Sequence, residues 1–216
     1  MIITYYGGEF LKVQTGDTTL VFNPFGKDSS FAHDKKSPRF GADVVFVSVN
    51  DKDFNVVGQL LHGEKDPFVI SGPGEYEVKG VFIKGFITET TYSGKKRINT
   101  IYSVLCDGIH LCFLGALGSL DSVTSEIKGS IGGPDILFVP IGGGDVLSPS
   151  SAGKISLAFV PKVIIPMHYD EKNGKSSLRT FLGEEGRKKV DPLDKLVIKK
   201  KDLEEKVGEI VVLKAQ

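Results

Sequence analysis

The chain has 216 residues, of which 40% are apolar and 25% charged, and this predicts one domain, residues 1–216, that folds without a disulfide or metal. Basic and acidic residues number 27 each, so the net charge is zero, and we expect no general affinity for nucleic acid or for an anionic membrane. No secretory signal precedes the first expected strand, and no apolar run reaches the ~20 residues of a membrane span. We therefore expect a cytoplasmic protein.

Strand-like runs dominate the first half of the chain. A meander is predicted over 2–6, 10–13 and 19–22, followed by a polar loop over 26–42. The continuous apolar run at 43–49 indicates a strand buried on both faces, and a short helix is expected at 55–61. Further strands are expected at 68–70, 75–78, 81–86, 99–105 and 109–114.

The two cysteines flank a predicted hairpin turn. Asp107-Gly108 between two alternating apolar runs is a strong signal for a two-residue turn. Cys106 would then face Ile109, whereas the side chain of Cys112 would point to the opposite face of the sheet. We expect both thiols to be reduced, as is usual in the cytoplasm.

Helix signals appear in the second half. Ser148 and Pro149 suit the N-cap and first position of a helix over 149–159, and other helices are expected at 122–129 and 176–185. Strands are expected at 135–139, 162–166, 196–199 and 208–213. Two strand-rich blocks, each followed by helices, predict an α/β fold with four αββα layers.

Three strand ends carry residues that suit chemistry. Asp51 and Asp53 could bind a metal or act as a base; the alternative is that Asp53 caps a helix that starts near Phe54 and that Asp51 is a solvated turn residue. His168 could be a ligand or a hydrogen-bonded structural residue. The glycines at 142–144 could approach an anion or make a tight connection, and they lack the spacing of a nucleotide-binding fingerprint.

Several segments together resemble the metallo-β-lactamase superfamily, in particular its small Zn-dependent-hydrolase-like branch related to L-ascorbate-6-phosphate lactonase. The resemblance extends over almost the whole chain and implies the four-layer αββα sandwich of that superfamily. Its anchors are 22–25, 41–45, 72–80, 113–118, 135–143 and 163–169.

The resemblance also implies a two-metal site that holds a hydroxide nucleophile, with an H-x-H-x-D-H motif after the buried strand. Only Asp53 and His168 match the implied ligands outright. Val, Phe and Ala offer no lone pair to a metal, and Ser and Thr are poor zinc ligands. The positions that depart from the ligand pattern are Gly7-Gly8, Asn23, Val49, Asp51, Phe54, Thr90, Ala116 and Ser119.

We therefore expect a protein of this fold that has lost most metal ligands, binds no cofactor, and serves as a binding or interaction module rather than a dinuclear hydrolase. The alternative is a hydrolase with a single divalent metal (Zn, Mn or Fe) at Asp51, Asp53 and His168. A third hypothesis is a homo-oligomer formed by pairing of edge strands at 2–6 or 208–213. The sequence names no partner.

Overall fold

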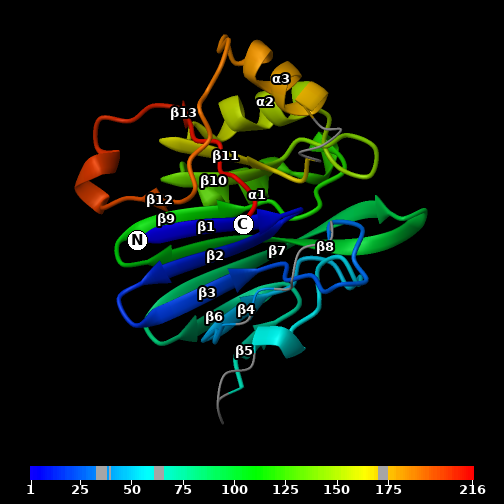
Figure 1. Cartoon of the computed structure of the whole chain (residues 1–216), viewed down its shortest axis with the longest axis vertical. Helices are drawn as coiled ribbons and strands as arrows, with labels where there is room; N and C mark the ends of the chain where they lie inside the picture. The colour runs from blue at the N-terminus through cyan, green and yellow to red at the C-terminus, as the bar shows by residue number, and fades with distance from the viewer. Residues whose placement is uncertain (33–37, 39, 61–65, 170–174) are drawn as a thin grey trace.

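The computed structural model describes residues 1–32, 38, 40–60, 66–169 and 175–216. Two β-sheets pack face to face, and helices lie on the outer side of the second sheet (Figure 1). This arrangement confirms the α/β sandwich that the sequence predicts.

The first sheet has six strands in the order β12-β1-β2-β3-β4-β5. The strands β1, β2, β3 and β12 pair antiparallel, whereas β3, β4 and β5 pair parallel. Their bounds are β1 Ile2–Gly7, β2 Phe10–Thr15, β3 Thr18–Phe22, β4 Val44–Phe46, β5 Phe68–Ile70 and β12 Leu196–Val197.

Among the described residues, the outer face of the first sheet is covered by loop residues and a short 3-10 helix rather than by an α-helix. Phe10, Val21 and Val45 form a buried cluster there with Leu60, which lies in the short 3-10 helix η1 (Gly58–Leu60). Of the helix expected at 55–61, residues 58–60 form this single turn and 55–57 are not helical, whereas residue 61 lies outside the described residues.

The second sheet has seven strands in the order β13-β11-β10-β9-β8-β7-β6. The strands β9, β10, β11 and β13 pair parallel, and β6, β7, β8 and β9 form an antiparallel meander. Their bounds are β6 Gly74–Val78, β7 Val81–Tyr92, β8 Lys95–Cys106, β9 Ile109–Phe113, β10 Ile136–Pro140, β11 Val163–Met167 and β13 Glu209–Ile210.

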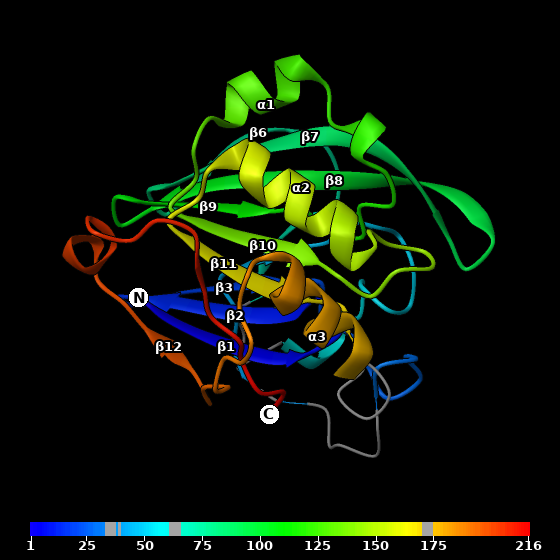
Figure 2. The same ribbon diagram turned by 90° about the horizontal axis from the view of Figure 1, so that it is seen from above.

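The hairpin of β7 and β8 is much longer than the predicted strands 81–86 and 99–105. It continues to a turn at Ser93 and Gly94, whose φ angles of 51° and 71° are typical of a two-residue hairpin turn. The added segment is polar, but Thr88, Thr90 and Tyr92 alternate with exposed residues and are buried. Figure 2 shows its tip extending past the other strands.

The α-helices of the described residues, α1 to α3, all belong to the second half of the chain. The helix α2 (Pro149–Phe159) begins where predicted, because the Ser148 side chain accepts a hydrogen bond from the Ser151 amide. The helix α1 (Ser125–Ile131) begins later than predicted, after the N-cap Thr124 and the 3-10 helix η2 (Leu120–Ser122). The helix α3 (Lys175–Glu184) packs against α2, which in turn contacts β10 (Figure 2).

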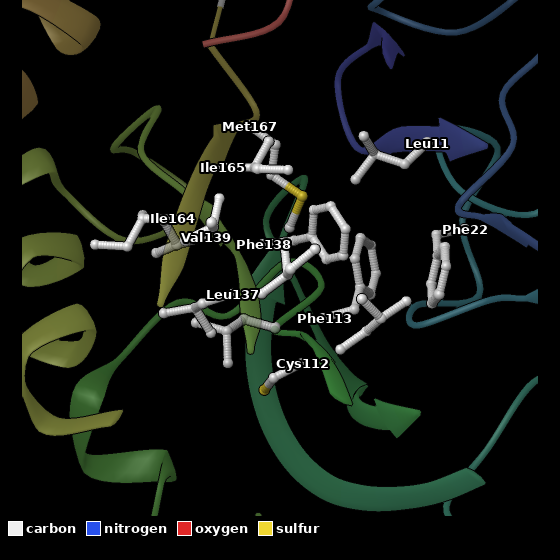
Figure 3. Packing of buried hydrophobic residues seen from close by; sticks show 14 of the residues in the cluster. Leu11, Phe22, Cys112, Phe113, Leu137, Phe138, Val139, Ile164, Ile165 and Met167 are labelled. Carbon is white, nitrogen blue, oxygen red and sulfur yellow. The ribbon is translucent and has the colours of Figure 1, made fainter. Parts of the chain in front are cut away.

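The main core lies between the two sheets. The Phe22 ring from β3 stacks on the ring of Phe46, with 4.5 Å between the ring centroids. Its centroid lies 4.9 Å from that of Phe113 in the second sheet. Figure 3 shows Leu11 and Phe22 facing Phe113 and Phe138 across this interior. All of these side chains are fully buried, so the two sheets are joined mainly by apolar packing.

The cysteine hairpin forms as predicted. Cys106 pairs with Ile109 across the turn of Asp107 and Gly108, and both cysteines are free and buried. Burial raises the pKa of the Cys106 thiol to about 12, so this thiol stays protonated and unreactive at neutral pH.

The edge-strand prediction is wrong for the N-terminal strand. The strand β1 lies between β12 and β2, and the Gln216 amide donates to the Tyr5 carbonyl, so this strand is not a free edge. The strand β13 does lie at the edge of its sheet.

Among the helices of the described residues, none is long and apolar enough to cross a membrane.

Candidate functional site

The ends of β3, β4 and β11 meet the turn between β1 and β2 in a buried polar network. The carboxylate of Glu9 lies 2.7 Å from His168 Nδ1 and accepts a hydrogen bond of 2.6 Å from Asn23 Nδ2. Asn23 also donates to Ser48 Oγ, and the Ser48 amide donates back to Asn23 Oδ1 at 2.8 Å. Glu9 is fully buried, so its charge depends on these partners for compensation.

Two residues of this network have left-handed backbones. Asn23 has φ +43° and His168 has φ +55°, both unusual for residues other than glycine. The His168 amide donates a 2.6 Å hydrogen bond to the Gly8 carbonyl, which ties the end of β11 to the turn between β1 and β2. His168 is therefore a hydrogen-bonded residue in this structure, one of the two roles that the sequence allows.

Sequence reasoning missed Glu9, although it makes the closest polar contact of the His168 side chain. It follows two glycines in a short turn, and nothing in that pattern indicates a fully buried carboxylate. Its partners follow it by 14 and 159 positions, so only the fold brings them together.

Asp53 is buried and holds a loop in place. Its carboxylate accepts hydrogen bonds from the Ser30 amide at 2.9 Å, the Ser30 hydroxyl at 2.8 Å and the Tyr92 hydroxyl at 3.0 Å. Burial by itself raises the pKa of Asp53, but the hydrogen bonds from residues 29–30 and Tyr92 outweigh it and hold the pKa below 3.8. No helix begins at Phe54, so the prediction that Asp53 caps one there is wrong.

Asp51 faces a different partner. Its carboxylate lies 2.7 Å from Arg97 Nη2, and its other oxygen accepts a hydrogen bond from the Asp53 amide. Arg97 also donates to the Asn50 carbonyl at 2.6 Å. The pair fastens the segment after β4 to the long hairpin.

An apolar cluster fills the space between these polar groups. Three positions at which the family resemblance implies ligands, Val49, Phe54 and Ala116, are buried in one cluster with Tyr92 and Val146. The ring centroid of Phe54 lies 4.7 Å from that of Tyr92.

The His168 ring lies against this cluster. Its centroid is 4.9 Å from Phe31, 6.0 Å from Tyr92 and 6.2 Å from Phe54. The His168 ring is therefore bordered by aromatic side chains on the side that faces the apolar cluster.

The three candidate metal ligands are not brought together as a set. Asp51 pairs with Arg97, Asp53 with Ser30 and Tyr92, and His168 with Glu9. Within the described part of the chain, no three His, Cys, Asp or Glu side chains lie close enough to one another to hold a metal ion. The donor set of the described residues does not fit a dinuclear metal centre, because a zinc site normally takes at least three good protein ligands.

The glycine loop at 142–144 passes close to the backbone of His168. A Cβ on Gly142 would clash with the His168 carbonyl oxygen, so the chain segments after β10 and β11 approach too closely for any side chain. Gly143 and Gly144 have φ +74° and +64°, and the Gly143 amide donates to the Leu147 carbonyl. A tight connection accounts for these glycines, and Gly144 also borders a pocket.

Thr90 and Ser119, two further positions of the family pattern, line that pocket rather than the apolar cluster. The Ser119 hydroxyl accepts a hydrogen bond from the Asp121 amide and so caps η2. The Thr90 hydroxyl is buried and has no hydrogen-bond partner within the described residues.

Comparison with known proteins places this architecture. The sequence of residues 2–168 matches the family model of the beta-lactamase superfamily domain. A search of curated protein sequences found no significant match.

Among solved structures, a Thermotoga maritima protein assigned to the Zn-dependent hydrolases of the metallo-β-lactamase superfamily is 28% identical, with a TM-score of 0.72 over 98% of this chain and 97% of that one. A protein of Parabacteroides distasonis assigned as a metal-dependent hydrolase is 15% identical, with a TM-score of 0.66 over 99% and 93% of the two chains. Igni18, a metallo hydrolase of Ignicoccus hospitalis, is 16% identical, with a TM-score of 0.63 over 99% and 95%. The chain belongs to the metallo-β-lactamase superfamily.

Proposed function

We propose that this protein is a binding or interaction module that has lost the dinuclear hydrolase chemistry of its superfamily. One observation carries the proposal: Val49, Phe54 and Ala116 pack with aromatic residues in the place where the family pattern implies metal ligands. Without ligands at these positions the chain lacks the usual means of lowering the pKa of a metal-bound water.

The replacements are physically consistent with one another. A group of carboxylates and imidazoles left without metal would be buried and unpaired, at a cost of about 1–3 kcal/mol for each uncharged group. Val49, Phe54 and Ala116 avoid that cost, whereas the retained polar residues each have a partner in the protein. The proposal therefore explains both the losses and the residues that remain.

The two buried, free thiols support a location in a reducing compartment for this module. Cys106 and Cys112 are free, which suits a reducing compartment. Our proposal therefore places the protein in the cytoplasm.

The test is the metal content of tag-free protein, measured by elemental mass spectrometry before and after incubation with Zn, Mn or Fe, together with hydrolysis of lactones, phosphodiesters and thioesters. We expect far less than one equivalent of metal and no metal-dependent turnover. A matched control is the variant with Val49→His, Asp51→His, Phe54→His and Ala116→Asp, which restores four ligands of the family pattern and should gain metal affinity if it folds.

The alternative single-metal enzyme at Asp51, Asp53 and His168 makes the opposite prediction. Stoichiometric metal and turnover, both lost in the His168→Ala variant, would overturn our proposal and support that enzyme. Asp135→Ala offers a comparison, because Asp135 pairs with Lys162 and Lys200 away from this site.

A further inference from the structure

The strand β8 has a free edge along the outer part of the long hairpin. Residues 95–105 of β8 pair with β7, but only residues 102–106 pair with β9 on the other side. Within the described part of the chain, residues 95–101 therefore have a neighbouring strand on one side alone. Figure 2 shows this part of the hairpin extending past the other strands. An uncovered edge presents backbone groups that can pair with another chain.

The backbone groups of Lys96 and Ile98 point toward this free edge. The Thr100 amide donates a 2.9 Å hydrogen bond to the Ser48 carbonyl, so it points away from β7. Alternate residues of an antiparallel strand direct their N–H and C=O groups to the same side, so those of Ile98 and Lys96 also point away from β7. The contact with Ser48 covers the edge at Thr100, and Ile98 and Lys96 lie beyond it.

A pocket of about 350 Å³ lies along the same edge. Residues 96–98 of β8 form one wall, and the segments that follow β4 and β5 form the other, with Ser48, Asn50 and residues 71–73 as their lining. The segment after β4 is held in place, because Arg97 donates to the Asn50 carbonyl at 2.6 Å. The edge of β8 is therefore bordered by a hollow with fixed walls.

The side chains beside the edge combine apolar surface with positive charge. Ile98 is 54% exposed, and Ile87 is 55% exposed at a diagonal position on the same face of the hairpin. Lys96 projects to this face as well, is exposed, and makes no ion pair with another described residue. Arg97 projects to the opposite face, where Asp51 pairs with it. A strand added next to β8 would thus meet an apolar side chain and an unpaired ammonium group.

The charges favour an acidic partner over a second copy of this chain. Pairing of two copies through this edge would bring their basic segments, residues 95–97, close together, and like charges on neighbouring strands are unfavourable. The carboxylate of Glu89 does not offset this, because Glu89 lies opposite Ile98 on β7, one strand farther from the edge. A segment that carries carboxylates avoids the repulsion and matches Lys96.

We propose that the free edge of β8 binds an extended acidic segment of a partner protein, which adds one antiparallel strand to the second sheet. Its backbone pairs with Ile98 and Lys96, while an apolar side chain lies beside Ile98 and a carboxylate beside Lys96. These two side chains are two positions apart in the partner, since alternate residues of a strand share a face. Because it names a partner for the interaction module, this proposal rests on the proposed function.

The experiment is an NMR titration of the ¹⁵N-labelled full chain with the capped heptapeptide TVTETVT. We expect saturable shifts of the amide signals of residues 96–98, and binding at least about tenfold weaker for TVTKTVT, whose lysine replaces the glutamate. N-methylation of the valine and glutamate residues should weaken binding by about tenfold or more, because their amides face β8. The isomer N-methylated at the threonines between them is the control, since those amides face away from β8.

A charge exchange locates the site. Lys96→Glu should weaken binding of TVTETVT by about tenfold and strengthen binding of TVTKTVT. Lys95→Glu is the matched control, because Lys95 is the adjacent lysine on β8 but projects to the opposite face and does not border the pocket. It should change both affinities much less.

Four results would overturn the proposal: no shifts at millimolar peptide, shifts only away from residues 96–98, equal binding of the two N-methylated isomers, or unchanged binding by Lys96→Glu. Metal content and hydrolysis, measured on the same preparation, separate this proposal from the loss of hydrolase chemistry. A metal-free, inactive protein that binds no peptide rejects only the added strand, whereas metal-dependent turnover rejects the loss of hydrolase chemistry.

Discussion

The interior between the two sheets and the region at the strand ends are both buried, but different contacts hold them together. Between the sheets, aromatic and aliphatic side chains such as Phe22 and Phe113 pack in one apolar cluster. At the strand ends, Glu9 and His168 form a buried polar pair next to the aromatic residues Phe31 and Phe54. The interior follows general rules of burial, whereas the strand ends depend on particular partners.

The largest expected effect lies between the sheets. Phe113→Ala should lower the free energy of unfolding by about 3–5 kcal/mol, because it removes a fully buried ring and leaves a cavity. Urea denaturation measures the change. Phe82→Ala is the control, since Phe82 is 52% exposed on the same sheet and should cost far less. Equal losses for the two variants would contradict the proposed apolar core.

At the strand ends, Glu9→Ala should lower the free energy of unfolding by about 3 kcal/mol, because it removes a hydrogen-bond acceptor of Asn23 Nδ2 and leaves His168 Nδ1 without its carboxylate partner. Urea denaturation again gives the value. Glu77→Ala, on the exposed face of β6, serves as the comparison and should change stability little. A Glu9→Ala variant as stable as Glu77→Ala would show that the polar pair contributes nothing to this region.

The contrast between the apolar interior and the polar strand ends also explains which parts of the structure the sequence predicts. The apolar runs at 43–49, 135–139 and 162–166 predict buried strands because burial depends mostly on each residue's own chemistry, and they overlap β4, β10 and β11. The α/β sandwich of two packed sheets follows from the order of these runs.

The contacts of the site could not be predicted in this way. The sequence singles out Asp51, Asp53 and His168 as reactive groups but not their partners Arg97, Tyr92 and Glu9, which are far away in the chain. The polar tip of the β7–β8 hairpin was also missed, because threonine alternation is a weaker signal than an apolar run. Only Ser93-Gly94 could have indicated its turn.

The buried carboxylate of Asp53 predicts a dependence of stability on pH. Its pKa is lowered in the folded state, so the ionised form stabilises the fold fully above the ordinary value of 3.8, and this stabilisation is lost as the pH falls through the folded-state pKa. At neutral pH, Asp53→Asn should therefore cost about 2 kcal/mol. The cost should shrink in acid.

Urea denaturation of wild type and Asp53→Asn at a series of pH values between neutral and strongly acidic provides the measurement. Asp17→Asn, in the exposed turn between β2 and β3, is the control and should follow the wild type. A difference between wild type and Asp53→Asn that stays constant with pH would mean that the ionised carboxylate is not the stabilising form.

The smallest effect distinguishes two threonines on the same face of β7. Thr88 donates to the Asn99 carbonyl at 3.0 Å and accepts from Asn99 Nδ2 at 2.9 Å, whereas the equally buried Thr90 has no partner within the described residues. Thr88→Val should cost about 1–3 kcal/mol, because it removes one of the two hydrogen bonds that Asn99 Nδ2 donates, the other going to the Leu114 carbonyl. Thr90→Val removes an unsatisfied group and should be neutral or slightly stabilising.

Each valine variant is the other's control, because both replace a hydroxyl by a methyl group in one strand. Thermal unfolding of the two proteins without added ligand gives the comparison directly. If Thr90→Val is destabilised as much as Thr88→Val, the Thr90 hydroxyl already has a partner in the free protein.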